Sequence, residues 1–355
     1  MNTFFSFEGS RAVPAIALAL GLSTSVLADQ GVRTPAGRAD SHAPIGVMGD
    51  HLHKAGEFMA SYRHMTMSME GYRKGENRLT SHQVFMQGFS AAATNMDMDM
   101  DMFGFMYAPS DNVTLMLMAN HLDMEMNMEM NPHAGMGHGH MDMGMGHDMH
   151  MSHSTSGWGD VSLSALVRGW EKDSHKLHWN LGISAPTGSV TEMMHMQFQP
   201  YGMQLGSGTW DAKIGATYSG SKDRYGWGAQ ALGTVRLESE GDSGFSRADA
   251  LEASVWGNWL LSAPLSFSAR LKYSAEGALD GHYNGPHPHS APNNFTSNYG
   301  GDILEVLVGL NYLFTDGTLK GHRLALEYGK PVYQQLNGVG MNREDTLTLG
   351  WQYAW

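Results

Sequence analysis

The sequence predicts an all-β protein: an antiparallel outer-membrane β-barrel of about twelve strands, with short periplasmic turns and long extracellular loops. Three observations predict it. Downstream of residue 28 there is no run of about 18 apolar residues, so the chain offers no membrane helix. Segments of about ten residues instead alternate apolar and polar side chains, as barrel walls do. The gaps between these segments mostly alternate long and short, which a soluble β-sandwich has no reason to do.

The N-terminal residues resemble a targeting segment. Arg11 precedes an apolar run at 13–22, and Val26-Leu27-Ala28 suits a cleavage site, so residues 1–28 are predicted to be a signal peptide. An anchor helix is the alternative, but about 11 apolar residues cannot cross a bilayer core. Residues 29–56 are then expected to form an N-terminal periplasmic segment, and 57–355 the transmembrane barrel.

Twelve segments carry the strand pattern. In the last one Leu347, Leu349, Trp351 and Tyr353 alternate with smaller or polar residues, and the chain ends on the aromatic Trp355. An even number of strands returns both termini to the periplasm, and the protein is expected in the bacterial outer membrane. The predicted strands are 57–70, 95–107, 113–130, 159–171, 175–186, 208–219, 225–239, 247–261, 264–277, 301–314, 321–333 and 345–355.

Composition excludes several function classes. The net charge of -13 disfavours nucleic acid as a partner, and the absence of cysteine removes disulfides, iron–sulfur clusters and thiol nucleophiles. HExxH, GxxxxGK[ST] and GxSxG motifs are missing, so no enzyme activity is predicted. Methionine is abundant instead: 23 of the 29 methionines lie between Met48 and Met151.

The long loop 131–153 holds six histidines and six methionines among glycines and aspartates, so these methionines cannot serve a packed core. Thioethers favour Cu(I), and imidazole suits copper, zinc and nickel. We expect bound copper or silver ions here, with no cofactor required; the alternative is incidental affinity, like that of a histidine tag. The predicted ligands are His133, Met136, His138, His140, Met141, Met143, Met145, His147, Met149, His150, Met151 and His153. His51 and His53 are weaker candidates near the periplasmic face.

Three methionine ladders run at period two, so each occupies one face of its strand. Leu115 and Leu117 suit lipid, which turns the opposite parity, with the methionines, toward the lumen. This orientation places the intervening acids outward, which is tolerable only above the lipid. The alternative turns methionine to lipid and the acids inward. The predicted lumen-lining methionines are Met65, Met67, Met69, Met98, Met100, Met102, Met116 and Met118.

Ionisable residues also share the inward parity of several strands. Inside a barrel such residues usually form structural ion pairs that narrow the lumen. The set comprises Arg63, Arg168, Arg236, Arg270, Lys272, Glu305, Arg323 and Glu327.

Several phrases, in order, resemble one known family: APIGVMGDHLHKAGEFMASYRHM, MYAPSDNVTLM, GDVSLSAL, YGMQLGSGTWD, LKGHRLALEYGKPVYQQLNG and TLTLGWQYAW. Together they resemble the bacterial outer-membrane barrel family named for the meta-pathway of phenol degradation, over about 42–355. The resemblance implies an outer-membrane barrel and passage of small molecules such as aromatic compounds. It brings no catalytic residues, and the His/Met-dense loop exceeds the family pattern.

The sequence therefore predicts an outer-membrane transport or channel protein whose His/Met-rich loop binds soft metal ions. Its partners would be outer-membrane lipid and a small solute or metal ion, and its oligomeric state stays open. One alternative is passive uptake of aromatic or other small hydrophobic compounds. A second is a soluble periplasmic copper-binding protein built as a β-sandwich.

Overall fold

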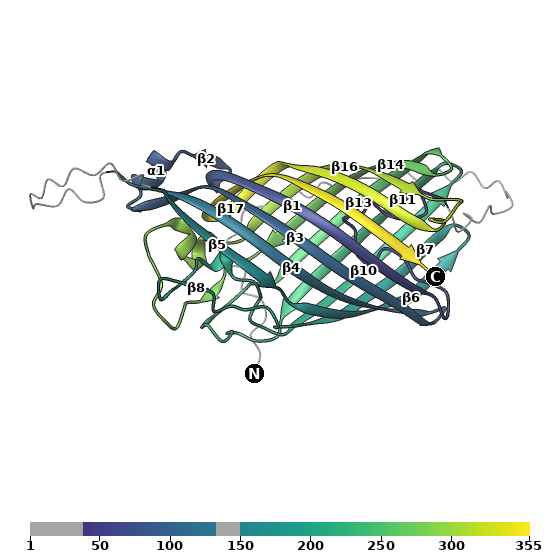
Figure 1. Cartoon of the computed structure of the whole chain (residues 1–355), viewed down its shortest axis with the longest axis horizontal. Helices are drawn as coiled ribbons and strands as arrows, with labels where there is room; N and C mark the ends of the chain where they lie inside the picture. Colours follow the sequence, from purple (N-terminus) through teal and green to yellow (C-terminus); the bar gives the residue numbers. More distant parts are fainter. Residues whose placement is uncertain (1–37, 133–149) are drawn as a thin grey trace, which may run out of the picture. The chain divides into compact units, whose positions relative to one another are not determined.

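The computed structural model describes residues 38–132 and 150–355, and most of them form the wall of an antiparallel barrel (Figure 1). The strands alternate inward and outward side chains because successive residues of a strand point to opposite faces. Among the described residues no helix is long and apolar enough to cross a membrane. The wall elements are β1 (Phe58–Gly75), β3 (Ala91–Ser110), β4 (Val113–Met130), β6 (Val161–Lys172), β7 (His175–Ala185), β10 (Asp211–Lys222), β11 (Tyr225–Arg236), β13 (Ala250–Ser262), β14 (Leu265–Glu276), β16 (Gly301–Leu313) and β17 (His322–Ala354).

The wall closes because β17 pairs with both β16 and β1. Residues 323–336 of β17 pair with β16, and residues 336–354 pair with β1. All strand pairings around the wall are antiparallel, and a closed ring of antiparallel strands needs an even number of passes across the wall. The described wall has eleven elements, so one of them must cross it twice. That element is β17, whose chain reverses direction between its two halves. Hydrogen bonds join its two halves, from Arg343 N to Gln334 Oε1 (3.1 Å) and from Trp351 Nε1 to His322 Nδ1 (3.0 Å). Eleven described wall elements thus give twelve passes.

This closure confirms the predicted barrel, and the β-sandwich alternative is wrong. A sandwich leaves free strand edges, whereas the pairing of β17 with β1 removes them. The short connections also match the expected tight turns: two-residue links join β3 to β4, β6 to β7 and β10 to β11. In two of these turns Asp173 and Asp223 adopt left-handed backbone with φ of 56° and 52°.

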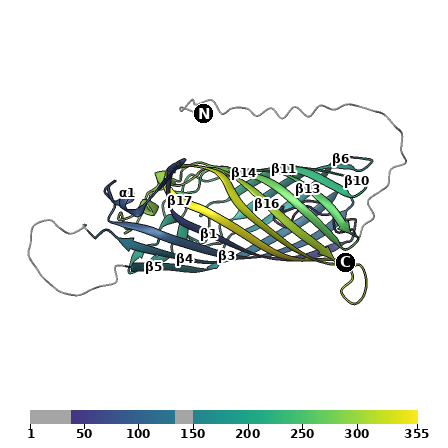
Figure 2. The ribbon, with the colours of Figure 1, turned by 90° about the horizontal axis from the view of Figure 1, so that it is seen from above.

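The long connections carry small elements of their own, which gather at one end of the barrel (Figures 1 and 2). β5 pairs with residues 121–129 of β4, whereas residues 113–118 of β4 pair with β6. These elements are β2 (Asn77–Leu79), α1 (Ser81–Phe85), β5 (His150–Trp158), β8 (Met193–Met194), β9 (Gln197–Phe198), β12 (Phe245–Ser246), β15 (Asp280–Gly281) and the 3-10 helices η1 (Tyr201–Met203), η2 (Pro292–Asn294) and η3 (Thr296–Asn298).

The outer surface of β3 changes character part-way along the strand. Phe103, Phe105 and Tyr107 are exposed and apolar, whereas Asp97 and Asp99 are exposed and acidic. The change is aligned across strands, because Phe103 pairs with Ala119 of β4 and Asp101 pairs with His121. The acids therefore lie on the stretch of wall beyond the apolar band, where a carboxylate is tolerated.

The segment before β1 differs from the expectation of a periplasmic segment at 29–56. Residues 39–53 of this segment lie inside the barrel, and we call them the plug. Ala39, Ile45 and Val47 are almost fully buried although the segment forms no strand or helix. The plug has no neighbouring strand to pair with among the described residues. Its backbone carbonyl groups accept hydrogen bonds from inward side chains of the wall instead.

Candidate functional site

Methionines of three neighbouring strands lie in register. Met67 of β1 pairs with Met98 of β3, which pairs with Met124 of β4. One step along the same face, Met69, Met96 and Met126 form the same arrangement. We call these two cross-strand rows the methionine triads. Side chains directly opposite each other on adjacent strands have Cβ atoms about 4.5–5.5 Å apart, so three flexible thioethers can meet at one point.

The triads face inward. Met96, Met124 and Met126 are each at most 5% exposed, and Met67 and Met98 line an internal cavity of about 730 Å³. We call this cavity the chamber. Its methionines are Met48, Met67, Met69, Met96, Met98, Met100, Met102, Met116, Met118 and Met341.

The sequence assigned eight methionines to the lumen, and the structure locates them as follows. All of them except Met65 line the chamber. Met65 is partly buried on β1 and pairs with Met100. Met48, Met96 and Met341 also line the chamber but were not in the predicted set. Met96 belongs to the same ladder, whereas nothing in the local sequence marks Met48 or Met341.

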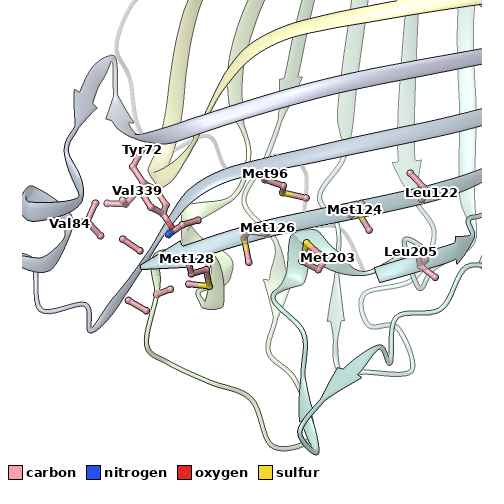
Figure 3. Close-up of a cluster of buried hydrophobic side chains, with 14 residues drawn as sticks. Tyr72, Val84, Met96, Leu122, Met124, Met126, Met128, Met203, Leu205 and Val339 are labelled. Carbon is pink, nitrogen blue, oxygen red and sulfur yellow. The ribbon is translucent and has the colours of Figure 1, made fainter. Parts of the chain in front are cut away.

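At the extracellular end the methionines continue into a packed cluster (Figure 3). Met128 of β4 and Met203 of η1 are buried there, with Tyr72 and Val84 from the β1 and α1 side. The Asn293 amide lies 3.2 Å from the Met126 sulfur and donates to it. The cluster therefore connects the wall to the loops that cover this end of the chamber.

The wall opposite the triads is polar. Lys213 of β10, Glu252 of β13 and Glu276 of β14 line it, with Arg247 of the loop before β13. Arg343 of β17 also lines the chamber, but it lies beside the triads, where it pairs with Met69. The chamber thus offers thioethers on one side and charges of both signs on the other. Small-molecule and ion sites often combine an apolar wall with a few polar groups.

An aromatic cluster covers the chamber from the loop side. The rings of Tyr201 and Tyr283 stack at 4.2 Å, and Phe198 stacks on Tyr283 at 4.4 Å. Tyr299 lines the chamber itself, and its hydroxyl accepts from Gly202 N at 2.9 Å. Burial raises the pKa of Tyr201, Tyr283 and Tyr299, so these hydroxyls stay protonated at neutral pH.

The plug forms the floor of the chamber, since Met48 and Gly49 line it. Arginines of the wall hold the plug by its carbonyl groups: Arg63 Nε donates to Ile45 O at 2.9 Å, and Arg323 Nη2 donates to Ala43 O at 2.6 Å. On the far side His178 donates to Gly49 O at 2.9 Å. The bonds to charged donors are the stronger kind.

All but one of the other predicted lumen charges form buried pairs, and Arg168 is the exception. Arg270 and Glu327 make a two-pronged contact of 3.0 and 2.7 Å, and Glu327 also accepts from Gly46 N of the plug at 3.1 Å. Lys272 lies 2.7 Å from Glu305. Arg236 pairs with Asp211 at 2.5 Å. Arg168 lies at the periplasmic turn, where it donates to Asp111 O and contacts Glu171.

Most of the predicted metal-ligating loop lies outside the described residues: this applies to His133, Met136, His138, His140, Met141, Met143, Met145, His147 and Met149. His150 begins β5. Met151 is exposed, and the buried His153 contacts Gln199 Oε1 through Nδ1 at 2.6 Å. Burial lowers the pKa of His153, which keeps the ring neutral and able to coordinate.

Comparison with known proteins agrees with this architecture. The COG4313 outer membrane channel from Pseudomonas putida F1 is 13% identical, with a TM-score of 0.58, over 88% of this chain and 100% of that one. A Pseudomonas aeruginosa FadL homologue is 10% identical, with a TM-score of 0.43, over 91% and 99%. No curated protein matches the chain. The closed barrel and the apolar side chains exposed on its outer face assign the protein to the bacterial outer membrane.

The family model described as "Putative MetA-pathway of phenol degradation" matches residues 81–342, most of the barrel. The match confirms the resemblance seen in the sequence. The chain belongs to this family of outer-membrane barrels.

Proposed function

We propose that this protein is an outer-membrane transport channel whose chamber binds a soft monovalent ion, Cu(I) first and Ag(I) as its analogue. One observation carries the proposal: the two methionine triads are aligned across β1, β3 and β4, and their four members on β1 and β3 line the chamber. Thioethers prefer Cu(I) over harder cations. Leucine would pack equally well at these positions. The inward-facing positions of β1 and β3 along the triads nevertheless contain no leucine.

The surroundings of the triads support cation entry. The outer faces of the same strands carry Asp97, Asp99, Asp123 and Glu125, which raise the local concentration of cations at the mouth. We further propose that the His/Met-rich loop 131–153 captures the ion before it reaches the chamber. Imidazole and thioether together suit copper in either oxidation state.

A titration tests the chamber. Full-length protein competes for Cu(I) with a chromogenic chelator under reducing conditions, and a Met67→Leu/Met98→Leu/Met124→Leu variant is compared with it. Leucine conserves volume and apolarity, so packing is kept while the sulfurs are lost. The triad variant should retain at least one Cu(I) equivalent fewer than wild type.

A matched control replaces three exposed methionines outside the chamber, Met86, Met193 and Met196, with leucine. The control should retain wild-type Cu(I) uptake. Equal uptake by the triad variant and the control would refute the chamber site.

The second candidate function is passage of small hydrophobic or aromatic compounds. The chamber volume of about 730 Å³ lies in the range of small-molecule pockets, and methionine sulfur packs well against aromatic rings. Swelling of liposomes in phenolic solutes, unchanged by the triad substitutions and by Cu(I), would favour this function over metal binding.

A further inference from the structure

The plug contains a compact group of metal-ligating side chains directly below the chamber floor. His42, Asp50 and His51 each offer a ligand atom, and these atoms lie within 4.8 Å of one another. The rings of His42 and His51 are 4.6 Å apart between centroids, and those of His51 and His53 are 4.7 Å apart. Two imidazoles and one carboxylate thus meet within the plug, and His53 extends the group through its ring contact with His51.

The local fold brings them together. A turn with a hydrogen bond from Val47 N to Pro44 O (2.9 Å) reverses the chain. Asp50 then reaches back, with its Oδ2 accepting from Ala43 N at 2.9 Å and its Oδ1 2.7 Å from His51 Nδ1. A carboxylate bonded to Nδ1 of a histidine directs Nε2 of that ring outward as a ligand.

Three ring nitrogens of this group have no hydrogen-bond partner among the described residues: His42 Nδ1, His51 Nε2 and His53 Nε2, all buried. His53 is itself only 6% exposed. A buried polar atom destabilises the fold as long as it has no partner.

We propose that His42, Asp50, His51 and His53 form a binding site for a divalent transition-metal ion such as Zn²⁺ or Cu²⁺. Nitrogen ligands about 2.0–2.1 Å from a tetrahedral ion are about 3.4 Å apart. The ligand atoms of His42, Asp50 and His51 already lie within 4.8 Å of one another, so side-chain rotation completes the site. Such an ion would tie residue 42 to residues 50–53 and hold the plug in its folded form.

The donor atoms of the group, more than the charges around it, favour this class of ion. Arg323 lies near His42 and Asp50, and its charge opposes every cation, so binding depends on nitrogen ligands that coordinate strongly without added negative charge. The single carboxylate within the group is Asp50, with Glu57 Oε2 3.5 Å from His53 Nδ1. Neutral imidazoles bind zinc and copper without needing more negative charge. The site does not depend on the methionine triads, so either can fail without the other.

Zinc is the suitable probe because it has no redox chemistry and thioethers bind it weakly. Tightly bound Zn²⁺ is counted on full-length protein and on a His42→Gln/His51→Gln variant, with His121→Gln/His175→Gln as a control that removes two histidines outside the plug. The control leaves loop 131–153 intact, so loop binding cancels. The plug variant should bind one zinc equivalent fewer than the control.

A rescue separates ligation from a structural role of the ring. His51→Asp supplies an anionic ligand at the same position and should restore the lost equivalent, whereas a role in packing would not be restored by a shorter side chain. In zinc-soaked crystals, anomalous scattering should give a peak at the group in wild type. Equal zinc counts in the plug variant and the control, or a wild-type crystal without that peak, would overturn the proposal.

Discussion

The strongest prediction concerns the buried pair of Arg270 and Glu327, because it joins the wall to the plug. Replacing Glu327 with leucine removes both contacts to Arg270 and the acceptor for Gly46 N. Breaking a buried ion pair by removing one partner costs about 3–5 kcal/mol, because the other charge remains buried. Of this loss in stability, about 1.5–3 kcal/mol concerns the plug, because Gly46 N loses its hydrogen bond to the charged Glu327 carboxylate. The state in which the plug has left its place in the barrel should therefore be about 10-fold to about 150-fold more populated in Glu327→Leu than in wild type.

Glu305 provides a matched control. It is as buried as Glu327 and pairs with Lys272 and Arg343, but it makes no hydrogen bond to the plug. Glu305→Leu should lower the urea stability of the barrel in lipid vesicles about as much as Glu327→Leu does. In planar bilayers only Glu327→Leu should show more frequent openings. Equal opening frequencies in the two variants would refute the role of the pair as the anchor of the plug.

Four further predictions concern the plug, the aromatic cluster, the outer face of the wall and the long loop. Gly46→Ala should also increase openings, because an added Cβ meets the side chains of Arg270 and Glu327. Tyr283→Ala should destabilise the aromatic cluster by about 3–5 kcal/mol and so make the loops that carry it sensitive to added protease. Tyr283→Phe should destabilise it by about 1 kcal/mol. Leu117→Arg should destabilise folding into vesicles by up to about 2–4 kcal/mol, and Glu125→Arg hardly at all, as measured by heat-dependent gel migration. Replacing residues 133–149 with a glycine–serine linker should slow copper uptake into loaded liposomes without removing the chamber equivalent; unchanged uptake would contradict capture by the loop.

Local periodicity predicts the wall well. The segment expected at 113–130 coincides with β4, because its alternation is unbroken. The segment expected at 95–107 is shorter than β3, which begins at Ala91. Ala91, Ala92 and Ala93 show no alternation, and all three are buried in the cluster that also contains Val84 of α1. A strand end that depends on such packing has no signal in its own sequence.

The plug shows where sequence reasoning stops. Its residues have neither strand nor helix periodicity, and their burial arises from contacts more than a hundred positions away, such as Arg323 with Ala43 and His178 with Gly49. His51 and His53 could be recognised as ligands from their spacing. Their association with His42 depends on a turn and on the Asp50 side chain, which spacing alone does not reveal.

The inward methionines and the outward acids are two consequences of one arrangement. Side chains alternate with period two, so a strand reading Met-Asp-Met-Asp must present thioethers on one face and carboxylates on the other. A lipid-facing run of carboxylates is costly, so such a strand must rise beyond the membrane. β1, β3 and β4 have 18, 20 and 18 residues, whereas β6 and β7 have 12 and 11. About six extra residues at about 3.3 Å each extend these strands by about 20 Å along their axes. The tall sector of the wall is therefore the condition that allows a thioether-lined chamber and a cation-attracting outer surface to share the same three strands.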